Sequence, residues 1–132
     1  MADPNIPADL QYSSEHEWTR VEGAEATIGI TFFAQDQLGD VVFIDLPETG
    51  ATVKQFDKFG EVESVKSVSD LFAPVGGEVV ARNDAVIDAP EKVNSDPYGE
   101  GWLIRVRLSA PAELDGLLDA TAYESLTKDA GH

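Results

Sequence analysis

The chain has no cysteine among its 132 residues. It therefore has no disulfide, no thiolate nucleophile and no cysteine-ligated metal site, so any thiol chemistry must come from a group that the protein binds. Histidine is almost as scarce, because only His16 and His132 are present. The sequence therefore offers no histidine-based catalytic triad and no paired-histidine ligand motif, and we expect no metal site. His16 stands between Glu15 and Glu17 and is expected to be solvated or structural.

Basic side chains are the second scarcity. Nine lysines and arginines stand against 25 acidic residues, which gives a formal net charge of −16. A surface of this sign repels a phosphate backbone and an anionic lipid leaflet, so we expect no nucleic acid partner and no membrane partner. Residues 1–10 contain neither a basic segment nor an apolar one, and no apolar run in the chain approaches about 18 residues. We expect a soluble, cytoplasmic protein that folds as one domain over residues 1–132.

Two β-hairpins stand out in the pattern of apolar and turn residues. The first joins residues 17–21 to residues 24–30, with a glycine in its turn. The second joins residues 60–65 to residues 67–72, with Lys66 between the two arms. A chain with these signals and few long helical patterns is expected to be mainly β.

The segments between and after these hairpins extend the β body. Residues 32–38 are expected to form a short helix, with Thr31 as its N-cap and a glycine at its end. Residues 41–46 are apolar in succession until Asp45, which predicts a strand buried on both faces. Over residues 102–108, apolar residues alternate with Leu103 and two arginines, which predicts a half-buried strand with the arginines facing water.

The two ends of the chain differ in character. Residues 1–10 contain two prolines and two aspartates and are expected to form a loose lead-in, which Ile6 and Leu10 could pin to the body. Residues 111–128 are expected to form a helical tail with a capping box at Thr121-x-x-Glu124.

The common catalytic motifs are absent. No P-loop, no Gly-x-Gly-x-x-Gly before a helix and no calcium loop occurs in the sequence. Glu61 and Glu63 are two residues apart on one predicted strand, so they form a solvated strand face rather than an acid/base pair. We therefore expect a protein that is not itself an enzyme.

Lys66 is the residue that the pattern singles out. It lies in Ser64-Val65-Lys66-Ser67-Val68, which has none of the Gly, Asn or Asp residues that tight hairpin turns favour. A turn over residues 65–68 would place Lys66 at the tip of the hairpin, with its amine in solvent and two partly exposed valines beside it. This context predicts a lysine that a modifying enzyme recognises.

Five separated blocks together resemble the H-protein family of the glycine cleavage system. They read SEHEWTRVEG, ATIGIT with AQDQLGDVVFIDLPETG, GEVESVKSVSDLFAPVGGEVV, VNSDPYGEGWLIRV and LDGLLDATAYESL, and they cover nearly the whole chain. The resemblance implies an all-β flattened barrel-sandwich hybrid of two small antiparallel sheets, with short helices near residues 32–38 and at the C-terminus. It also implies that Lys66 carries lipoic acid in amide linkage. The attachment motif then comprises Glu63, Ser64, Val65 and Ser67 around that lysine.

The resemblance implies a carrier function and a set of partners. In this family the lipoyl arm shuttles an aminomethyl group from a pyridoxal-phosphate glycine decarboxylase to a tetrahydrofolate-dependent aminomethyltransferase, and its dithiol is reoxidised by dihydrolipoyl dehydrogenase. A lipoyl ligase or an octanoyl transferase would load the arm. The carrier is expected to be a monomer. Glu17 and Asp70 match acidic positions of the family, and our hypothesis is that they accept hydrogen bonds from the loaded ammonium group.

Three alternative functions use a similar fold. A biotinyl carrier domain favours methionine on both sides of its lysine, whereas Lys66 lies between Val65 and Ser67. A lipoyl donor that passes its group to 2-oxoacid dehydrogenases would use the same lysine. A non-catalytic adaptor that has lost the cycle is opposed only by the intact lysine block.

Overall fold

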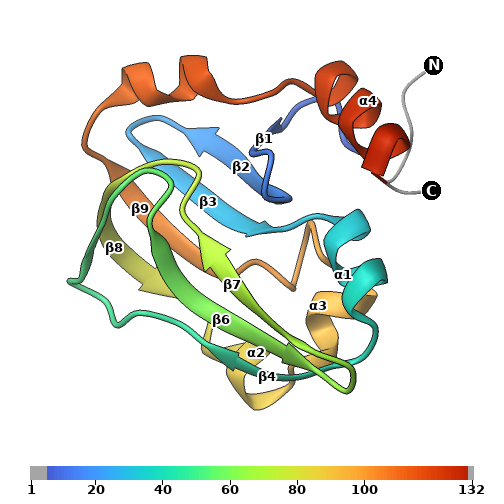
Figure 1. The fold of residues 1–132 in the computed structure, drawn as a ribbon. Helices are drawn as coiled ribbons and strands as arrows, with labels where there is room; N and C mark the ends of the chain where they lie inside the picture. Colours follow the sequence, from blue (N-terminus) through green and yellow to red (C-terminus); the bar gives the residue numbers. More distant parts are fainter. Residues whose placement is uncertain (1–5, 131–132) are drawn as a thin grey trace.

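The computed structural model describes the backbone of residues 6–130 and the side chains of residues 6–127. One set of strands comprises β1 (Gln11–Tyr12), β2 (Glu17–Glu22), β3 (Glu25–Ile30), β5 (Thr52–Val53), β8 (Gly77–Arg82) and β9 (Ile104–Leu108). A second set comprises β4 (Val41–Asp45), β6 (Lys58–Ser64) and β7 (Val68–Phe72). The helices are α1 (Phe32–Leu38), α2 (Asp84–Asp88), α3 (Glu91–Ser95), a 3-10 helix (Pro111–Gly116) and α4 (Ala120–Ala130). The strands form a six-stranded sheet in the order β1-β2-β3-β9-β8-β5 and a three-stranded sheet in the order β4-β6-β7 (Figure 1).

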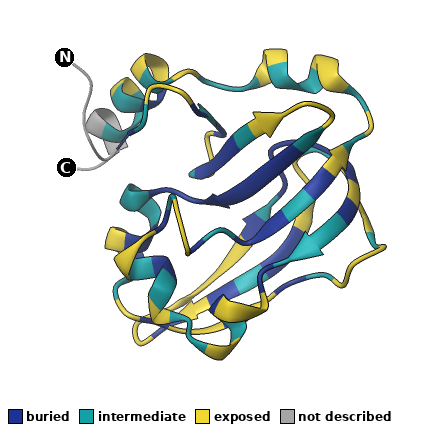
Figure 2. Cartoon of the chain, turned by 180° about the vertical axis from the view of Figure 1, so that it is seen from behind, coloured by how far each residue is buried: buried dark blue, intermediate teal, exposed yellow. Residues whose placement is uncertain are grey.

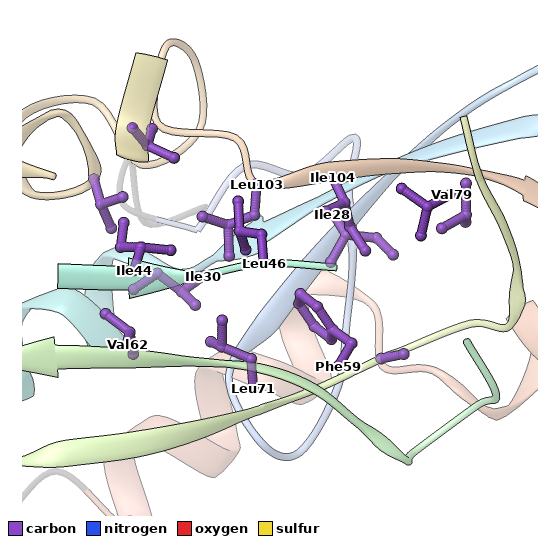
Figure 3. Packing of buried hydrophobic residues seen from close by; sticks show 14 of the residues in the cluster. Ile28, Ile30, Ile44, Leu46, Phe59, Val62, Leu71, Val79, Leu103 and Ile104 are labelled. Carbon is purple, nitrogen blue, oxygen red and sulfur yellow. The ribbon is translucent and has the colours of Figure 1, made fainter. Parts of the chain in front are cut away.

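The two sheets face each other across a shared hydrophobic core. Ile28, Val79 and Ile104 come from the larger sheet, and each is fully buried. Val62 and Leu71 come from the smaller sheet and are 2% exposed. Figure 3 shows side chains from the two layers pointing toward one another. Because each sheet covers the apolar face of the other, the predicted all-β barrel-sandwich of two antiparallel sheets is confirmed.

The β2–β3 hairpin and α1 form where the sequence predicts them. The two strands pair antiparallel along their length, from Glu17 opposite Ile30 to Glu22 opposite Glu25. Thr31 then caps α1, because its hydroxyl accepts the Ala34 N–H at 3.2 Å. These contacts fix the start of α1 directly at the end of β3.

The prediction for β4 is wrong in one respect. Val42 and Phe43 are 50% and 54% exposed, whereas Ile44 is buried. β4 lies at the edge of the smaller sheet, and its register with β6 shifts between Val41 and Phe43. An irregularity of this kind breaks the alternation of side chains, so two consecutive apolar residues face outward. Since the core covers only one face of this sheet, the second face stays in solvent.

The prediction for the strand that contains β9 is also wrong at its start. Leu103, which the predicted alternation groups with the two arginines, is 1% exposed, and Trp102 is only partly buried. Regular pairing begins at Ile104, so the alternation does not extend back to residue 102. The Leu103 N–H donates to the carbonyl of Ile28 at 2.8 Å. The Trp102 ring lies outside, with the Arg105 guanidinium 5.3 Å from its centroid.

The structure adds two short helices between β8 and β9 that we did not predict. Asn83 precedes α2 and caps it by accepting the Ala85 N–H at 3.2 Å. Val86 on α2 and Val93 on α3 are fully buried in the core. Each helix has five residues, which is too short for an apolar periodicity to emerge from the sequence.

The helical tail forms, but its predicted cap does not. α4 begins at Ala120, so Thr121 lies within the helix rather than before it. The Asp119 carboxylate accepts the Ala122 N–H at 2.8 Å, so Asp119 caps the N-terminus of α4. The predicted capping box at Thr121 and Glu124 is therefore wrong, and the cap lies two residues earlier, at Asp119.

A second apolar cluster attaches both ends of the chain to the larger sheet. Ile6 and Leu10 are buried there with Trp18, and Tyr12 stacks on Tyr123 of α4 with ring centroids 4.6 Å apart. The pinning of the lead-in by its two apolar residues is confirmed, while residues 1–5 lie outside the described residues. Figure 2 shows that most buried positions lie in the strands, while exposed positions occur in the helices, the loops and parts of the strands.

Candidate functional site

The lysine-bearing turn connects β6 to β7, as predicted. Glu63 pairs with Val68 across the hairpin, so residues 64–67 form the turn, one residue earlier than predicted. The Ser64 N–H donates to the Ser67 carbonyl at 2.8 Å and closes it. Lys66 is therefore the third residue of the turn rather than the second.

The Ser64 hydroxyl stabilises this turn, which lacks the glycine or asparagine of a common hairpin turn, by accepting backbone hydrogen bonds. Ser64 is 5% exposed, and its hydroxyl oxygen accepts the N–H of Lys66 at 3.2 Å and of Ser67 at 3.1 Å. A serine hydroxyl can replace a backbone partner in this way. The Ser-Val-Lys-Ser sequence thus specifies an ordered turn.

Lys66 is exposed at the tip of this turn. Its two apolar neighbours, Val65 and Val68, are 69% and 58% exposed, as predicted. The Val65 N–H donates to the Asp40 carbonyl at 3.1 Å, which ties the turn to the segment after α1. Among the ion pairs of residues 6–127 there is none that involves Lys66. A free, exposed amine on a fixed turn is accessible to an acylating enzyme.

A cleft of about 500 Å³ lies beside the hairpin. It is bordered by β7, by α1 and by the start of β2, and its lining mixes apolar groups with carboxylates. The lining residues are Glu15, His16, Glu17, Ile30, Phe33, Ala34, Gln37, Val62, Val68, Ser69, Asp70, Leu71 and Phe72. The structure therefore places Glu17 and Asp70, the two predicted arm contacts, on the same cleft.

Glu17 is a buried carboxyl rather than an ordinary surface one. It is 1% exposed, and its carboxyl oxygens lie 2.5 Å from the Ser13 hydroxyl and 3.2 Å from the Phe72 N–H. Burial raises the pKa of Glu17 to about 8, although the hydrogen bonds from Ser13 and Phe72 oppose the shift. Ser13 also positions the loop, because its hydroxyl accepts the Glu17 N–H at 3.1 Å. We did not predict Ser13, and no local pattern marks it.

Asp70 has a different environment. It is on the outer face of the smaller sheet with a side chain 47% exposed, and its carboxylate lies 3.2 Å from the Lys58 ammonium. Lys58 also contacts Glu61 at 2.7 Å. Glu61 therefore belongs to a surface ion-pair network, while Glu63 is exposed on the same strand, as expected of a solvated face. A charged ligand that approached Asp70 would compete with Lys58.

His16 lines the cleft and contacts Tyr123 of α4. His16 has a positive φ of 73°, and its Nδ1 lies 2.8 Å from the Tyr123 hydroxyl. That hydroxyl is also 2.6 Å from the Thr31 hydroxyl, at the start of α1. Burial lowers the pKa of His16. Its role here is structural, since it links the loop before β2 to α4, a link that only the folded chain reveals.

Within residues 6–130 no group of three or more histidine, cysteine, aspartate or glutamate side chains is placed to hold a metal ion. The same part of the chain contains no helix that is long and apolar enough to cross a membrane.

The fold and the site together define a carrier domain: two packed antiparallel sheets that present one lysine on the exposed turn of a hairpin. Comparison with known proteins defines the class further. The family model described as glycine cleavage H-protein matches residues 10–130. The chain belongs to the glycine cleavage H-protein family, and it is therefore a lipoyl-bearing carrier of the glycine cleavage system.

Individual relatives agree with this assignment over their whole length. The chain is 61% identical over 125 residues to a glycine cleavage system H protein of Symbiobacterium thermophilum, covering 95% of this chain and 98% of the relative. It is 59% identical over 124 residues to one of Brevibacillus brevis, covering 94% and 98%. The crystal structure of a glycine cleavage system H protein from Mycobacterium marinum superposes with a TM-score of 0.84 at 41% identity, covering 96% of this chain and 100% of that one.

Proposed function

We propose that the lipoyl group of this carrier is attached through an amide bond to Nζ of Lys66. The observation that carries the proposal is the position of Lys66, exposed on an ordered turn within the part of the chain that matches the family. Glu63, Ser64, Val65 and Ser67 complete the attachment motif. Of these, Ser64 orders the turn through its hydroxyl, and Val65 anchors it through its N–H.

The residues of the chain bind, present and protect the arm, and we propose that they catalyse no step. When bound, the lipoyl group supplies a disulfide that accepts an aminomethyl group and is regenerated by oxidation of the dithiol. The partners proposed are the pyridoxal-phosphate glycine decarboxylase, the tetrahydrofolate-dependent aminomethyltransferase and dihydrolipoyl dehydrogenase. A lipoyl ligase or octanoyl transferase is the proposed loading enzyme. A monomer suits this work, because a tethered group reacts at a high effective concentration and docking can then stay brief.

Two expectations from the sequence stay predictions. These are the organisation of residues 1–132 as one domain and the location in the cytoplasm. Neither is needed for the attachment chemistry at Lys66.

Glu17 and Asp70 are proposed to hold the ammonium group of the loaded arm in the cleft. Both residues line the cleft, but Asp70 is exposed at the surface and Glu17 is buried. Asp70 attracts a cation from the surface, while the buried Glu17 carboxyl keeps its proton near neutral pH. An ammonium group beside Glu17 would lower the pKa of this carboxyl and favour the charged pair. Closing the arm into the cleft would also exclude water from the adduct.

The intact mass of protein from its own cell tests the attachment site. We expect the added mass of one lipoyl group, mapped by peptide analysis to Lys66 and absent from Lys66→Ala. Lys54→Ala serves as the control and should keep the modification. An unmodified Lys66 that a competent lipoyl ligase also ignores would refute the proposal.

The role of the two carboxyls has its own test. Glu17→Gln combined with Asp70→Asn should shorten the lifetime of the aminomethyl-loaded arm, measured by release of its methylene group as formaldehyde. Asp45→Asn, on the exposed face of β4 and outside the cleft lining, is the control. A lifetime equal to that of the unsubstituted protein would remove the proposed role while leaving the attachment site intact.

A further inference from the structure

The side chain of Asn94, on α3, fixes the backbone of residues 39–41, which lie beside the lysine-bearing turn. The Asn94 amide nitrogen donates to the Gly39 carbonyl at 2.8 Å and to Oε1 of Gln35 at 3.0 Å. Its Oδ1 accepts the Val41 N–H at 2.9 Å. Asn94 therefore holds the backbone on both sides of Asp40. Three hydrogen bonds from one partly buried amide leave this short segment little freedom.

Asp40 in turn holds the lysine-bearing turn. Its carbonyl accepts the Val65 N–H at 3.1 Å, one residue before Lys66. The side chain of Lys66 then passes close to Gly39, where a Cβ would lie 3.1 Å from Lys66 Cε. Gly39 has a φ of 79°, which glycine adopts without strain, so the same residue ends α1 and leaves room for the lysine stem. A continuous set of contacts thus runs from α3 to the acceptor lysine.

We propose that Asn94 is a positioning residue for the acylation of Lys66, acting through the Asp40 carbonyl and the Val65 N–H. The inference rests on the proposed attachment at Lys66 and identifies the contacts that position this lysine. The lysine stem is a flexible four-carbon chain, so the enzyme that acylates it depends on the backbone of the turn for a fixed starting point. A turn held in one geometry lowers the entropy lost when the amine reaches the acyl group.

Removing the Asn94 side chain leaves three groups without their partner at once. The Gly39 carbonyl, the Gln35 side chain and the Val41 N–H would turn to water or to each other, and Asp40 would lose its fixed position. The turn keeps its own closure through Ser64 and therefore stays a turn. It would, however, sample more orientations relative to α1. The expected defect is in the presentation of Lys66 and not in its chemistry.

Asn83 offers a matched control. It is also an asparagine with three side-chain hydrogen bonds: it accepts the Ala85 N–H and donates to the carbonyls of Glu100 and Trp102. None of these partners belongs to the segment after α1 or to the lysine-bearing turn. Asn83→Ala therefore removes a comparable set of contacts from a different part of the fold. Asn94→Asp is a second variant of similar size, which keeps the acceptor for Val41 but replaces both donated hydrogen bonds by a carboxylate oxygen facing the Gly39 carbonyl and Gln35 Oε1.

The experiment measures acylation of the purified chain by a lipoyl ligase with lipoic acid and ATP, at a temperature where circular dichroism shows each variant folded. We expect kcat/KM to fall about fivefold for Asn94→Ala, by a similar factor for Asn94→Asp, and to stay within about twofold for Asn83→Ala. Hydrogen exchange of the Val65 amide is the second readout. It should speed up about tenfold in Asn94→Ala and stay near the unsubstituted rate in Asn83→Ala.

The outcomes separate this inference from the attachment itself. If the unsubstituted chain is acylated at Lys66 and Asn94→Ala is acylated equally fast, Asn94 is not a positioning residue and the attachment site stands. An equal loss in Asn83→Ala would also overturn the inference, because general destabilisation would explain both. If the unsubstituted chain is not acylated at all, the attachment proposal fails and this one falls with it.

Discussion

Trp18 and Gly29 pair across β2 and β3, and the indole lies over the glycine. A Cβ on Gly29 would come within 2.7 Å of three indole atoms. The ring is fully buried, and its Nε1–H donates to the Pro97 carbonyl at 2.9 Å. The pair therefore joins the first hairpin to the turn that leads into β9. Trp18 follows directly after Glu17 on β2.

Gly29→Ala should destabilise the protein by about 2–3 kcal/mol, because the methyl group must displace a ring that is packed on all sides. Urea unfolding followed by tryptophan fluorescence measures the change. Gly116→Ala is the control, since a Cβ there meets nothing within 4 Å, and it should change stability by less than about 0.5 kcal/mol. Equal stability of the two variants would show that the indole can move at little cost.

The raised pKa of Glu17 predicts a stability that depends on pH. In the unfolded chain this carboxyl loses its proton near pH 4.5, whereas burial holds the proton in the folded chain until about pH 8. The folded state binds more protons across this window, so its stability falls as the pH rises from 4.5 to 8 and levels off above it. Glu17→Gln removes this dependence and should be the more stable protein at pH 8 by roughly 4 kcal/mol.

Unfolding by urea at several pH values measures this difference directly. Comparing the two proteins cancels the contributions of Glu15 and His16, which stay in both. Below about pH 4 the two stabilities should converge, because the carboxyl is then protonated in both the folded and the unfolded chain. A constant difference across the whole range would contradict the pKa of the buried carboxyl.

The lysine-bearing hairpin was predictable because local signals specify it. β6 and β7 follow each other along the chain, turn residues bound them, and a hairpin needs only a short connection between them. The exact turn was not predictable, since the Ser64 hydroxyl bonds to backbone N–H groups in a way that no turn propensity records. The predicted burial of residues 41–46 on both faces also failed at Val42 and Phe43, because β4 is an edge strand whose pairing with β6 shifts register there.

The environment of the cleft could not be read from the sequence. Glu17 looks like an exposed strand residue there, and its burial arises from the loop around Ser13 and from the end of β7. Asn94 stands in a turn-rich segment, and its partners are more than 50 residues away. Such contacts follow from how the layers pack and not from any local preference.

Tyr123→Phe should loosen α4 from the body. The substitution keeps the ring stacked on Tyr12 and removes a hydroxyl that contacts Thr31 at 2.6 Å and His16 at 2.8 Å. The cost should be about 1–2 kcal/mol, since the two partners stay partly buried. Urea unfolding gives the value, and hydrogen exchange should localise the loss to α4 and the start of α1. An unchanged stability would mean that His16 and Thr31 find each other or water without cost.

The last prediction concerns Lys58, whose ammonium group forms an ion pair with the Asp70 carboxylate. It lies 3.2 Å from Asp70 and 2.7 Å from Glu61. If Asp70 holds the ammonium of the loaded arm, Lys58 competes with it, so Lys58→Met should lengthen the lifetime of the loaded arm roughly twofold at low salt. Added salt should weaken the effect, since the pair is exposed and screened. Lys54→Met removes the same charge away from Asp70 and should leave the lifetime unchanged. A lengthening in both variants would point to net charge, whereas a shortening in Lys58→Met alone would mean that Lys58 supports the loaded arm instead of opposing it.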